Sequence, residues 1–510
     1  MTAVELFIEG LQERGVEWMA TLCGHGLDPL FGAARRAGMR LVDTRNEQTA
    51  SYIADAYGKL TGRPGVCAVS SGVAHANALA GVTNAWFDGA PMLLVSGAGA
   101  FRTAGMGHFQ DFDQAALARP VTKYARVIDC PERTLEILDE AFRTAVAPRP
   151  GPVHITFPMD VQTAEVDPGR LIHPRVRPAR RGAGASVEQA AGALRRSERP
   201  LIVAGSGLYY AGEGQAMLRF SERCLIPVVA PIWDRGTVDR PVDTFMGVIG
   251  AATGGPRLLA DADSILMAGA VADYRVGFLQ PGAIREDASV VYIEQGWEQL
   301  EAPVYTAWFQ EARRRREEFR ESVRRTGEAQ ARQGLHAIHV LEALRSALRD
   351  DTVLLIDGGS IGQWAHQLLC DRYPGHWLTC GRSAVVGWGI GGAMAARLAC
   401  PDRPVILLSG DGAFTFTVAD LECAARQKLP FVAIVADDQA WGITKAGHLR
   451  QFGEPLGSAL GPIDFARLAE SLGARGVTAT RPEEIQWELE RALAEPAVTV
   501  IHVPIVGGNP

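Results

Sequence analysis

Two acidic motifs stand one strand–helix–strand unit apart in the C-terminal third of the sequence. Gly410-Asp411-Gly412 follows the apolar run 404–408, and Asp437-Asp438 follows the next run, 431–436. Parallel strands end at the same edge of a sheet, so both motifs should bring carboxylates to one crevice. Two carboxylates and a backbone carbonyl would form half a shell for Mg²⁺, with diphosphate and water completing it. A helix from about Thr417 would add free N–H groups for phosphate. A plain turn explains Gly-Asp-Gly alone, but the second acidic pair favours the metal site.

Short apolar runs bounded by Gly or Pro predict the strands that would position these groups. They show little polar alternation, which is typical of strands covered on both faces. Helical stretches such as 47–60, 187–196 and 418–427 lie between them. The alternation predicts an α/β protein built from open parallel sheets. The runs are 65–69, 91–95, 152–157, 201–204, 227–230, 264–268, 290–293, 353–356, 404–408, 431–435 and 498–503.

Two polar segments divide the chain. Residues 175–185 are rich in Arg, Pro and Gly and have no apolar face, and residues 312–333 form a charged helical run without a stripe of core residues. Interpreting both as linkers predicts domains at 1–174, 186–310 and 335–510.

Composition narrows the class of protein. A length of 510 residues predicts about three domains. The net charge of −7 argues against nucleic acid or an anionic membrane as the main partner. No apolar run approaches the ~20 residues that span a bilayer, and the N-terminal segment lacks the order of a signal peptide. The eight cysteines include no Cys-x-x-Cys pair. These features predict a soluble, cytoplasmic protein.

The acidic motifs carry a family resemblance. Gly410-Asp411-Gly412, a spacer and a polar pair after a strand resemble the thiamine diphosphate motif, and the whole chain resembles the acetolactate synthase superfamily. The first third is similar to benzaldehyde lyase. The resemblance implies three α/β domains of the thiamine diphosphate-binding fold, namely pyrimidine-binding, middle and diphosphate-binding. It also implies a homodimer or homotetramer with active sites at the subunit interface.

The same resemblance assigns metal and diphosphate ligands. Asp411, Asp438 and the backbone carbonyl of Ala440 would hold Mg²⁺. The family usually has Asn-Asn where this chain has Asp437-Asp438, so the second carboxylate adds negative charge beside the diphosphate. The expected cofactor-binding residues of this third are Gly359, Ser360, Val386, Gly410, Asp411, Gly412, Ala413 and Asp438. Val386 would separate the two cofactor rings or pack in the core, and Trp441 would face the substrate.

Glu47 begins the predicted helix 47–60, in a segment that resembles the family's Arg-His-Glu sequence. A carboxyl group held against pyrimidine N1′ makes the cofactor's 4′-amino group basic enough to remove the weakly acidic thiazolium proton. Glu47 is the expected activating residue; the alternative is an acid that complements the helix dipole. The following loop, 70–77, should lie near the pyrimidine. Asn77 is expected to bind cofactor, while His75 either enters the pocket or is a buried structural histidine.

Residues 105–123 resemble the family segment in which a glutamine faces the thiazolium. This implies a catalytic role for Gln110, with His108 and Phe109 beside it near the substrate. His25 follows the first strand and is a further catalytic candidate, because histidine can exchange a proton at neutral pH.

The middle third carries two weaker signals. Gly205-Ser206-Gly207 superficially resembles a dinucleotide turn, but no acidic residue after the next strand completes that fingerprint, so FAD is not expected. Arg275 ends a segment that resembles the acetolactate synthases. It either forks onto a 2-oxo acid carboxylate or forms an ion pair at the surface or an interface.

Together these residues imply a thiamine diphosphate- and Mg²⁺-dependent enzyme that forms carbon–carbon bonds. It would decarboxylate a 2-oxo acid and transfer the acyl carbanion equivalent to a carbonyl acceptor, as acetolactate synthase does. Two alternatives stay open: a lyase that cleaves acyloins or diketones, and a cofactor-binding but inactive homologue. The expected partners are small 2-oxo acids, aldehydes or ketones, with no nucleic acid and no membrane.

Overall fold

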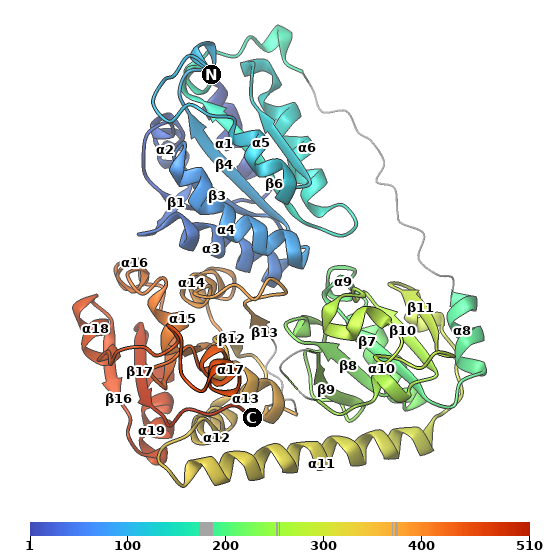
Figure 1. The fold of residues 1–510 in the computed structure, drawn as a ribbon. Helices are drawn as coiled ribbons and strands as arrows, with labels where there is room; N and C mark the ends of the chain where they lie inside the picture. Colours follow the sequence, from blue (N-terminus) through green and yellow to red (C-terminus); the bar gives the residue numbers. More distant parts are fainter. Residues whose placement is uncertain (173–186, 251–252, 254, 370, 373–375) are drawn as a thin grey trace. The chain divides into compact units, whose positions relative to one another are not determined.

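The computed structural model describes residues 1–172, 187–250, 253, 255–369, 371–372 and 376–510, which form two compact units (Figure 1). Unit 1 contains the described residues of Met1–Arg181 together with Ile390–Pro401 and Thr417–Leu429. Unit 2 contains the described residues of Gly182–Gly389, Asp402–Phe416 and Pro430–Pro510. The linker expected at 175–185 lies outside the described residues, and the three domain boundaries stay predictions.

Unit 1 is built on one parallel sheet of six strands in the order β2-β1-β3-β4-β6-β5. Its strands are β1 (Trp18–Leu22), β2 (Arg40–Asp43), β3 (Gly65–Val69), β4 (Met92–Ala98), β5 (Tyr124–Val127) and β6 (Pro152–Pro158). Its helices are α1 (Ala3–Glu13), α2 (Asp28–Arg36), α3 (Glu47–Thr61), α4 (Val73–Asp88), α5 (Gln114–Ala118), α6 (Thr134–Val146) and α7 (Met159–Thr163).

Local sequence explains where α3 begins and ends. The Asn46 side chain accepts a hydrogen bond from the backbone N–H of Gln48 at 2.9 Å, which caps the helix and leaves Glu47 as its first residue. Gly62 ends it in the left-handed conformation, which costs glycine little. Helix α4 lies beside α3 (Figure 1), and a buried Lys59 joins them through ion pairs to Asp55 and Asp88.

Two helices from the last third complete unit 1, namely α14 (Gly389–Ala399), apart from its first residue, and α16 (Asp420–Arg426). The Asp420 carboxylate accepts hydrogen bonds from the backbone N–H of Arg45 and the hydroxyl of Thr49. The helix expected from about Thr417 therefore begins at Asp420 and packs in unit 1. Its N-terminus is not the phosphate site that we expected.

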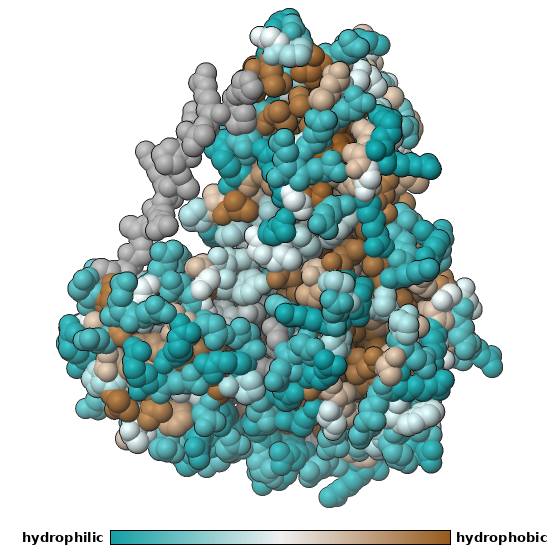
Figure 2. Space-filling model, turned by 180° about the vertical axis from the view of Figure 1, so that it is seen from behind, coloured by the Kyte–Doolittle hydropathy of each residue, from teal (hydrophilic) through white to brown (hydrophobic). Residues whose placement is uncertain are grey.

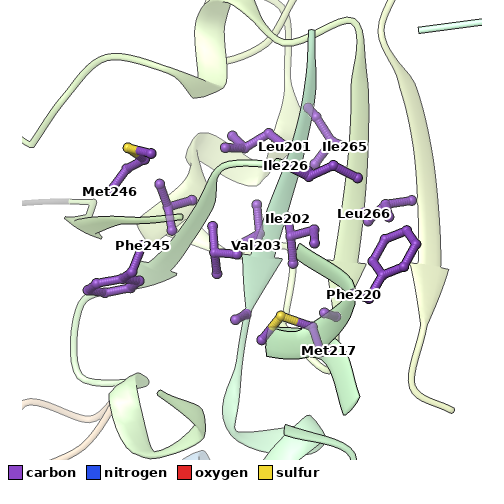
Figure 3. Close-up of a cluster of buried hydrophobic side chains, with 14 of the residues drawn as sticks. Leu201, Ile202, Val203, Met217, Phe220, Ile226, Phe245, Met246, Ile265 and Leu266 are labelled. Carbon is purple, nitrogen blue, oxygen red and sulfur yellow. The ribbon is translucent and has the colours of Figure 1, made fainter. Parts of the chain in front are cut away.

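The first sheet of unit 2 has five parallel strands in the order β11-β10-β7-β8-β9. Figure 3 shows its core, where Leu201, Ile202 and Val203 meet Met217 and Phe220 and the side chains of neighbouring strands. The strands are β7 (Pro200–Ala204), β8 (Val228–Pro231), β9 (Phe245–Ile249), β10 (Ser264–Ala268) and β11 (Ser289–Ile293). The helices are α8 (Val187–Arg195), α9 (Ser206–Tyr210) and α10 (Gly214–Cys224).

The second sheet of unit 2 has six parallel strands in the order β13-β12-β14-β15-β17-β16. They are β12 (Val353–Asp357), β13 (His376–Thr379), β14 (Val405–Gly410), β15 (Val432–Asp437), β16 (Arg475–Thr478) and β17 (Thr499–Pro504). Its helices are α12 (Ala337–Ala347), α13 (Ser360–Leu368), α15 (Asp411–Thr415), α17 (Gly442–Phe452), α18 (Phe465–Ser471) and α19 (Pro482–Ala494). All named strand pairs in the described residues are parallel, which confirms the predicted fold class.

The segment expected as a charged linker at 312–333 belongs to one long helix, α11 (Thr306–Ala331), drawn in yellow in Figure 1. Its first turns bury Trp308, Phe309 and Ala312 in the core of the five-stranded sheet. Val323 reaches the core of the six-stranded sheet. The expectation that this run lacks core residues was therefore wrong, because the few apolar residues are widely spaced among charges.

Hydrophilic side chains cover most of the face shown in Figure 2, with hydrophobic ones in smaller groups. In unit 1, several large apolar side chains are exposed, among them Val73, Phe87, Met106 and Phe109. Of the helices in the described residues, none is both long and apolar enough to cross a membrane.

Candidate active site

A cavity of about 280 Å³ opens in unit 2 where β12, β14 and β15 end. These three strands are neighbours in the sheet, so their carboxyl ends form one edge. The cavity brings together every site residue expected from the C-terminal third: Gly359, Ser360, Val386, Gly410, Asp411, Gly412, Ala413, Asp438, Ala440 and Trp441.

Two helices begin at this cavity. The first residues of α13 (Ser360, Ile361) and of α17 (Gly442, Ile443) line it. Neither helix has a side-chain hydrogen bond from its N-cap residue. Their first N–H groups therefore lack that partner, and the helix dipoles add positive potential. This end of the cavity is suited to an anion such as a diphosphate.

Two carboxylates face the same space. Burial, with the charges of Asp438 and Asp437, raises the pKa of Asp411 to about 7. Burial also raises the pKa of Asp438, against the opposing charge of Lys445. The backbone N–H of Ala440 donates to the Asp411 carboxylate at 3.2 Å. Because two ionised carboxylates in one buried site repel each other, a divalent cation bound to both would relieve that repulsion.

The other member of the acidic pair is turned away from the cavity. Asp437 accepts hydrogen bonds from Nε2 of His502 at 2.9 Å and from the backbone N–H of Gln439 at 3.0 Å. The side chains of His502 and Asp437 are both buried, and the Phe465 ring packs against His502. This contact separates the two aspartates, so that Asp438 alone of the pair lines the cavity.

A buried carboxylate that we did not anticipate supports the cavity wall. Asp357 ends β12 and accepts hydrogen bonds from the backbone N–H groups of Gly387 and Gly389, at 3.3 and 2.6 Å. Burial raises its pKa to about 6, against the effect of these two donors. The bonds fix the segment that carries Val386. The sequence showed this aspartate in Asp357-Gly358-Gly359-Ser360, but only the backbone and hydroxyl groups of that motif were expected to act.

The geometry fits a diphosphate bridged by a cation. A Cβ added at Gly410 would meet only Ile361, at 4.0 Å, so that position faces open space at the cavity. In the described residues no cluster of three or more His, Cys, Asp or Glu side chains could hold a metal unaided. A cation here would therefore depend on backbone, water or ligand oxygens for the rest of its shell.

In unit 1, Glu47 and Asn77 meet at the N-terminal end of α3. Nδ2 of Asn77 donates to Oε2 of Glu47 at 3.1 Å. Glu47 is partly buried and Asn77 is exposed, so the pair lies at the surface of this unit. The amide orients one carboxylate oxygen and leaves the other available to a ligand.

Gln110 lies beside the glycine loop before α4. Its φ of 56° is unusual for a residue with a side chain, and its Oε1 accepts a hydrogen bond from Oγ of Ser71 at 2.7 Å. A Cβ at Gly72 would meet the Gln110 side chain at 2.6 Å, so glycine is required there. Gln114, which we did not anticipate, joins this loop to β4 through Gly72 and Gly97.

His25 and Phe109 pack edge to face, with ring centroids 5.4 Å apart, and both are exposed. His108 is turned aside, because its ring nitrogens contact the Phe109 carbonyl and the Asp111 carboxylate, at 3.0 and 3.2 Å. His25 and Phe109 are thus accessible to a ligand, while His108 supports the loop.

Of the two alternatives for His75, the structure shows the buried histidine. Its side chain is fully buried, and Nδ1 lies 2.8 Å from Oγ of Ser96, whose hydroxyl also contacts His154. Burial lowers the pKa of His75 to about 4. The expectation that it contacts substrate does not hold, because this ring is enclosed by α4, β4 and β6.

Arg275 likewise forms an internal ion pair. Its guanidinium is 1% exposed and donates to the carboxylates of Asp273 and Asp234 and to the carbonyl of Ile232. The expected fork onto a substrate carboxylate does not occur here, because buried acceptors already engage this group.

The Gly-x-Gly turn of the middle region is filled by the protein itself. A Cβ at Gly205 would meet the Cα of Ala270 at 2.5 Å, and one at Gly207 would meet the carbonyl of Gly269 at 2.7 Å. These glycines allow two backbone segments to pack closely.

Family models match three successive parts of the chain. Residues 1–117 match the N-terminal thiamine pyrophosphate (TPP) binding domain of the thiamine pyrophosphate enzymes, residues 187–304 their central domain, and residues 357–503 their C-terminal TPP binding domain. This chain belongs to the thiamine pyrophosphate enzymes. The expected family is therefore confirmed. Most residues that line the unit 2 cavity lie in the C-terminal match, and Ile232 and Trp233 lie in the central one.

Curated relatives of this thiamine pyrophosphate enzyme carry two kinds of name. It is 28% identical to the acetolactate synthase large subunit IlvG of Mycobacterium tuberculosis, over 99% of this chain and 95% of the relative. It is 26% identical to the acetolactate synthase isozyme 2 large subunit of Escherichia coli, over 99% and 96%. It is 27% identical to human 2-hydroxyacyl-CoA lyase 2, over 93% and 85%.

Proposed function

We propose that this thiamine pyrophosphate enzyme is a carboligase that decarboxylates a 2-oxo acid and transfers the acyl carbanion equivalent to a carbonyl acceptor. The observation that carries this proposal is the unit 2 cavity. There two uncapped helix N-termini and two carboxylates, Asp411 and Asp438, converge at the ends of three neighbouring strands. The similarity to acetolactate synthases over nearly the whole chain supports the same reaction class.

Mg²⁺ would be held by Asp411, Asp438 and the carbonyl of Ala440. Gly359, Ser360 and the first N–H groups of α13 and α17 would bind the diphosphate, while Val386 would pack against the rings. When bound, the cofactor would supply a nucleophilic carbon and, in its cationic thiazolium ring, an electron sink for negative charge on the acyl carbon.

Glu47 would hold a proton at its carboxylate oxygen against the pyrimidine, with Asn77 orienting that carboxylate. Gln110 and His25 are the candidates that would bind or protonate substrate oxygens, and Phe109 would shield them from water. His25 is exposed and its loop is fixed, since its carbonyl accepts from Oγ of Ser70 at 2.7 Å.

A lyase is the second candidate, because relatives named 2-hydroxyacyl-CoA lyase match almost as well as the synthases. Such an enzyme would cleave a carbon–carbon bond next to a hydroxyl group without decarboxylation. An inactive, cofactor-binding homologue is less well supported, because Glu47 and its amide partner keep the arrangement that catalysis needs.

We also propose a cytoplasmic homodimer or homotetramer that uses no FAD and has its active sites at the subunit interface. The exposed apolar side chains of unit 1, such as Val73 and Phe109, support association. The free cysteines of the described residues support a reducing compartment.

The test is product analysis with thiamine diphosphate and Mg²⁺. Purified protein is given pyruvate and other 2-oxo acids, with and without aldehyde acceptors, and 2-hydroxy ketones and 2-hydroxyacyl thioesters in parallel. Release of CO₂ with formation of a 2-hydroxy ketone or a 2-hydroxy-3-oxo acid supports the carboligase. Cleavage of the hydroxylated substrates alone supports the lyase. Glu47→Gln serves as the inactive control, and product formation by that variant would exclude the role given to Glu47.

A further inference from the structure

Trp233 is a cavity residue with an unusual backbone. It follows β8 and has a φ of 69°, in the left-handed region that bulky residues avoid. Together with Ile232 it lines the cavity that contains Asp411 and Asp438. Such a conformation persists only where the surroundings enforce it, and it is found most often at functional sites.

The surroundings of Trp233 do enforce it. Nη1 of Arg275 donates to the carbonyl of Ile232 at 3.0 Å, and Oγ1 of Thr379 donates to the carbonyl of Trp233 at 3.2 Å. On the other side, the N–H of Asp234 donates to the carbonyl of Pro231 at 3.0 Å. The peptide groups before and after the indole are thus held at the same time.

Arg275 is the centre of this arrangement. Its Nη2 also pairs with the carboxylates of Asp273 and Asp234, at 3.0 and 3.5 Å, which joins both flanks of Trp233 to one buried guanidinium. The planar fork of arginine presents five N–H donors in a fixed geometry that reaches acceptors on both flanks, whereas a lysine presents three donors from one nitrogen atom. Arg275 is buried and does not face a substrate, and its contacts instead hold Trp233 in place.

Trp233 lies next to the segment that carries Val386. Thr379, which holds its carbonyl, ends β13, and the residues that follow contribute Cys380, Ala384 and Val386 to the cavity. A second link comes from Tyr274, whose hydroxyl donates to the carbonyl of Arg382 at 3.0 Å. Trp233 and the apolar residues Ala384 and Val386 therefore belong to the lining of the same cavity.

We propose that Trp233 is a specificity-determining residue that limits the size of the apolar group on the substrate carbonyl carbon, and that Arg275 is its positioning residue. The cavity accordingly favours small aliphatic acyl groups over aromatic ones. This inference rests on the proposed function and deepens it, because it names the substrate class of the same site.

The test compares Trp233→Ala with the wild type, using pyruvate and phenylglyoxylate as the aliphatic and aromatic probes. For each holoenzyme, kcat/KM and the dissociation constant of each acid are measured, the latter also in the Glu47→Gln background. Trp233→Ala should raise the ratio of kcat/KM for phenylglyoxylate to kcat/KM for pyruvate by at least about 10-fold. The affinity for thiamine diphosphate should stay within about 3-fold. Trp487→Ala, which removes an exposed tryptophan from α19, is the matched control and should leave the ratio unchanged.

Arg275 is tested by a double-mutant cycle. Arg275→Met should shift the ratio in the same direction as Trp233→Ala and add nothing in the double variant, whereas a merely structural arginine would give independent effects. Thermal melting checks that both variants fold, and Arg275→Lys repeats the cycle where Met prevents folding. A ratio within 2-fold of wild type in Trp233→Ala, for both turnover and binding, overturns the inference. If the dissociation constants of the two acids shift as expected but no 2-oxo acid is turned over, the result contradicts the proposed function and leaves the role of Trp233 intact.

Discussion

The charge of Asp438 should repel Asp411 when no cation is present and should bind Mg²⁺ when it is. Replacing Asp438 by asparagine tests these two roles separately. Without a cation, the carboxylates of Asp411 and Asp438 repel, and this repulsion contributes to the raised pKa of Asp411. Two unit charges about 4 Å apart at an effective dielectric constant of ~20 repel by roughly 4 kcal/mol. Lys445 and solvent screen the pair, so we expect about 1–2 kcal/mol of added stability in metal-free Asp438→Asn. For a unit of this size, this corresponds to a rise in melting temperature of roughly 1.5–3 °C.

With Mg²⁺ present, the same substitution should be unfavourable, because asparagine offers the cation a neutral oxygen in place of a charged one. Asparagine is the residue that the resembling family usually has here, so we expect Mg²⁺ still to bind, with an affinity lower by about 10-fold because one ligand loses its charge. The assay titrates thiamine diphosphate by calorimetry over a series of Mg²⁺ concentrations and compares melting curves in EDTA. Asp402→Asn, an exposed carboxylate on the turn before β14, is the matched control and should change neither quantity.

Unchanged melting in EDTA together with unchanged Mg²⁺ dependence would refute the assignment of Asp438 to the metal. A rise in melting temperature with unchanged Mg²⁺ dependence would keep the repulsion but place the cation elsewhere.

Three further predictions concern the rest of the site and its support. Gly410→Val places a side chain in open space at the cavity, so binding of thiamine diphosphate should weaken at least about 10-fold in calorimetry while the melting curve stays close to wild type; unchanged binding would contradict the placement of the diphosphate. Asn77→Ala removes an exposed hydrogen bond to Glu47 and should lower turnover with little loss of stability, about 1 kcal/mol or less by thermal melting. His75 is neutral when buried, with a pKa of about 4 against about 6.5 when unfolded, so the unfolded chain binds more protons as the pH falls. Unit 1 should lose about 2 kcal/mol between pH 7 and pH 5, measured by hydrogen exchange of β4 and β6, and His75→Gln should show a shallower dependence.

The central strands could be predicted from sequence and most edge strands could not. Every apolar run that was singled out became a strand, because strands buried on both faces need continuous apolar residues. Of the strands that were not among these runs, β2, β5, β9, β13 and β16 lie at sheet edges, and β1 lies inside its sheet between β2 and β3. Most of them are short and partly exposed, such as β5, so their residues carry no continuous apolar signal.

The candidate site could likewise be predicted only in part. The spacing of Asp411 and Asp438 was sufficient to predict that they share a crevice, because strand topology decides it. The burial of His75 and the ion pairs of Arg275 depend on neighbours far away in sequence, and nothing local distinguishes a buried cation from an exposed one. The contacts of Asp357 and Trp233 could not be predicted, because both involve backbone groups of segments far away in sequence.

The discontinuous make-up of unit 1 bears on how the protein is synthesised. Its sheet leaves the ribosome first, but the helical layer supplied by Ile390–Pro401 and Thr417–Leu429 is translated more than two hundred residues later. At about 5–20 residues per second, that delay is on the order of ten seconds to a minute. During this interval the surface that later receives Asp420 is uncovered, and a nascent chain in that state is a natural client for chaperones. A fragment that stops near residue 172 would keep this surface permanently bare and should aggregate unless the missing helices are supplied in trans.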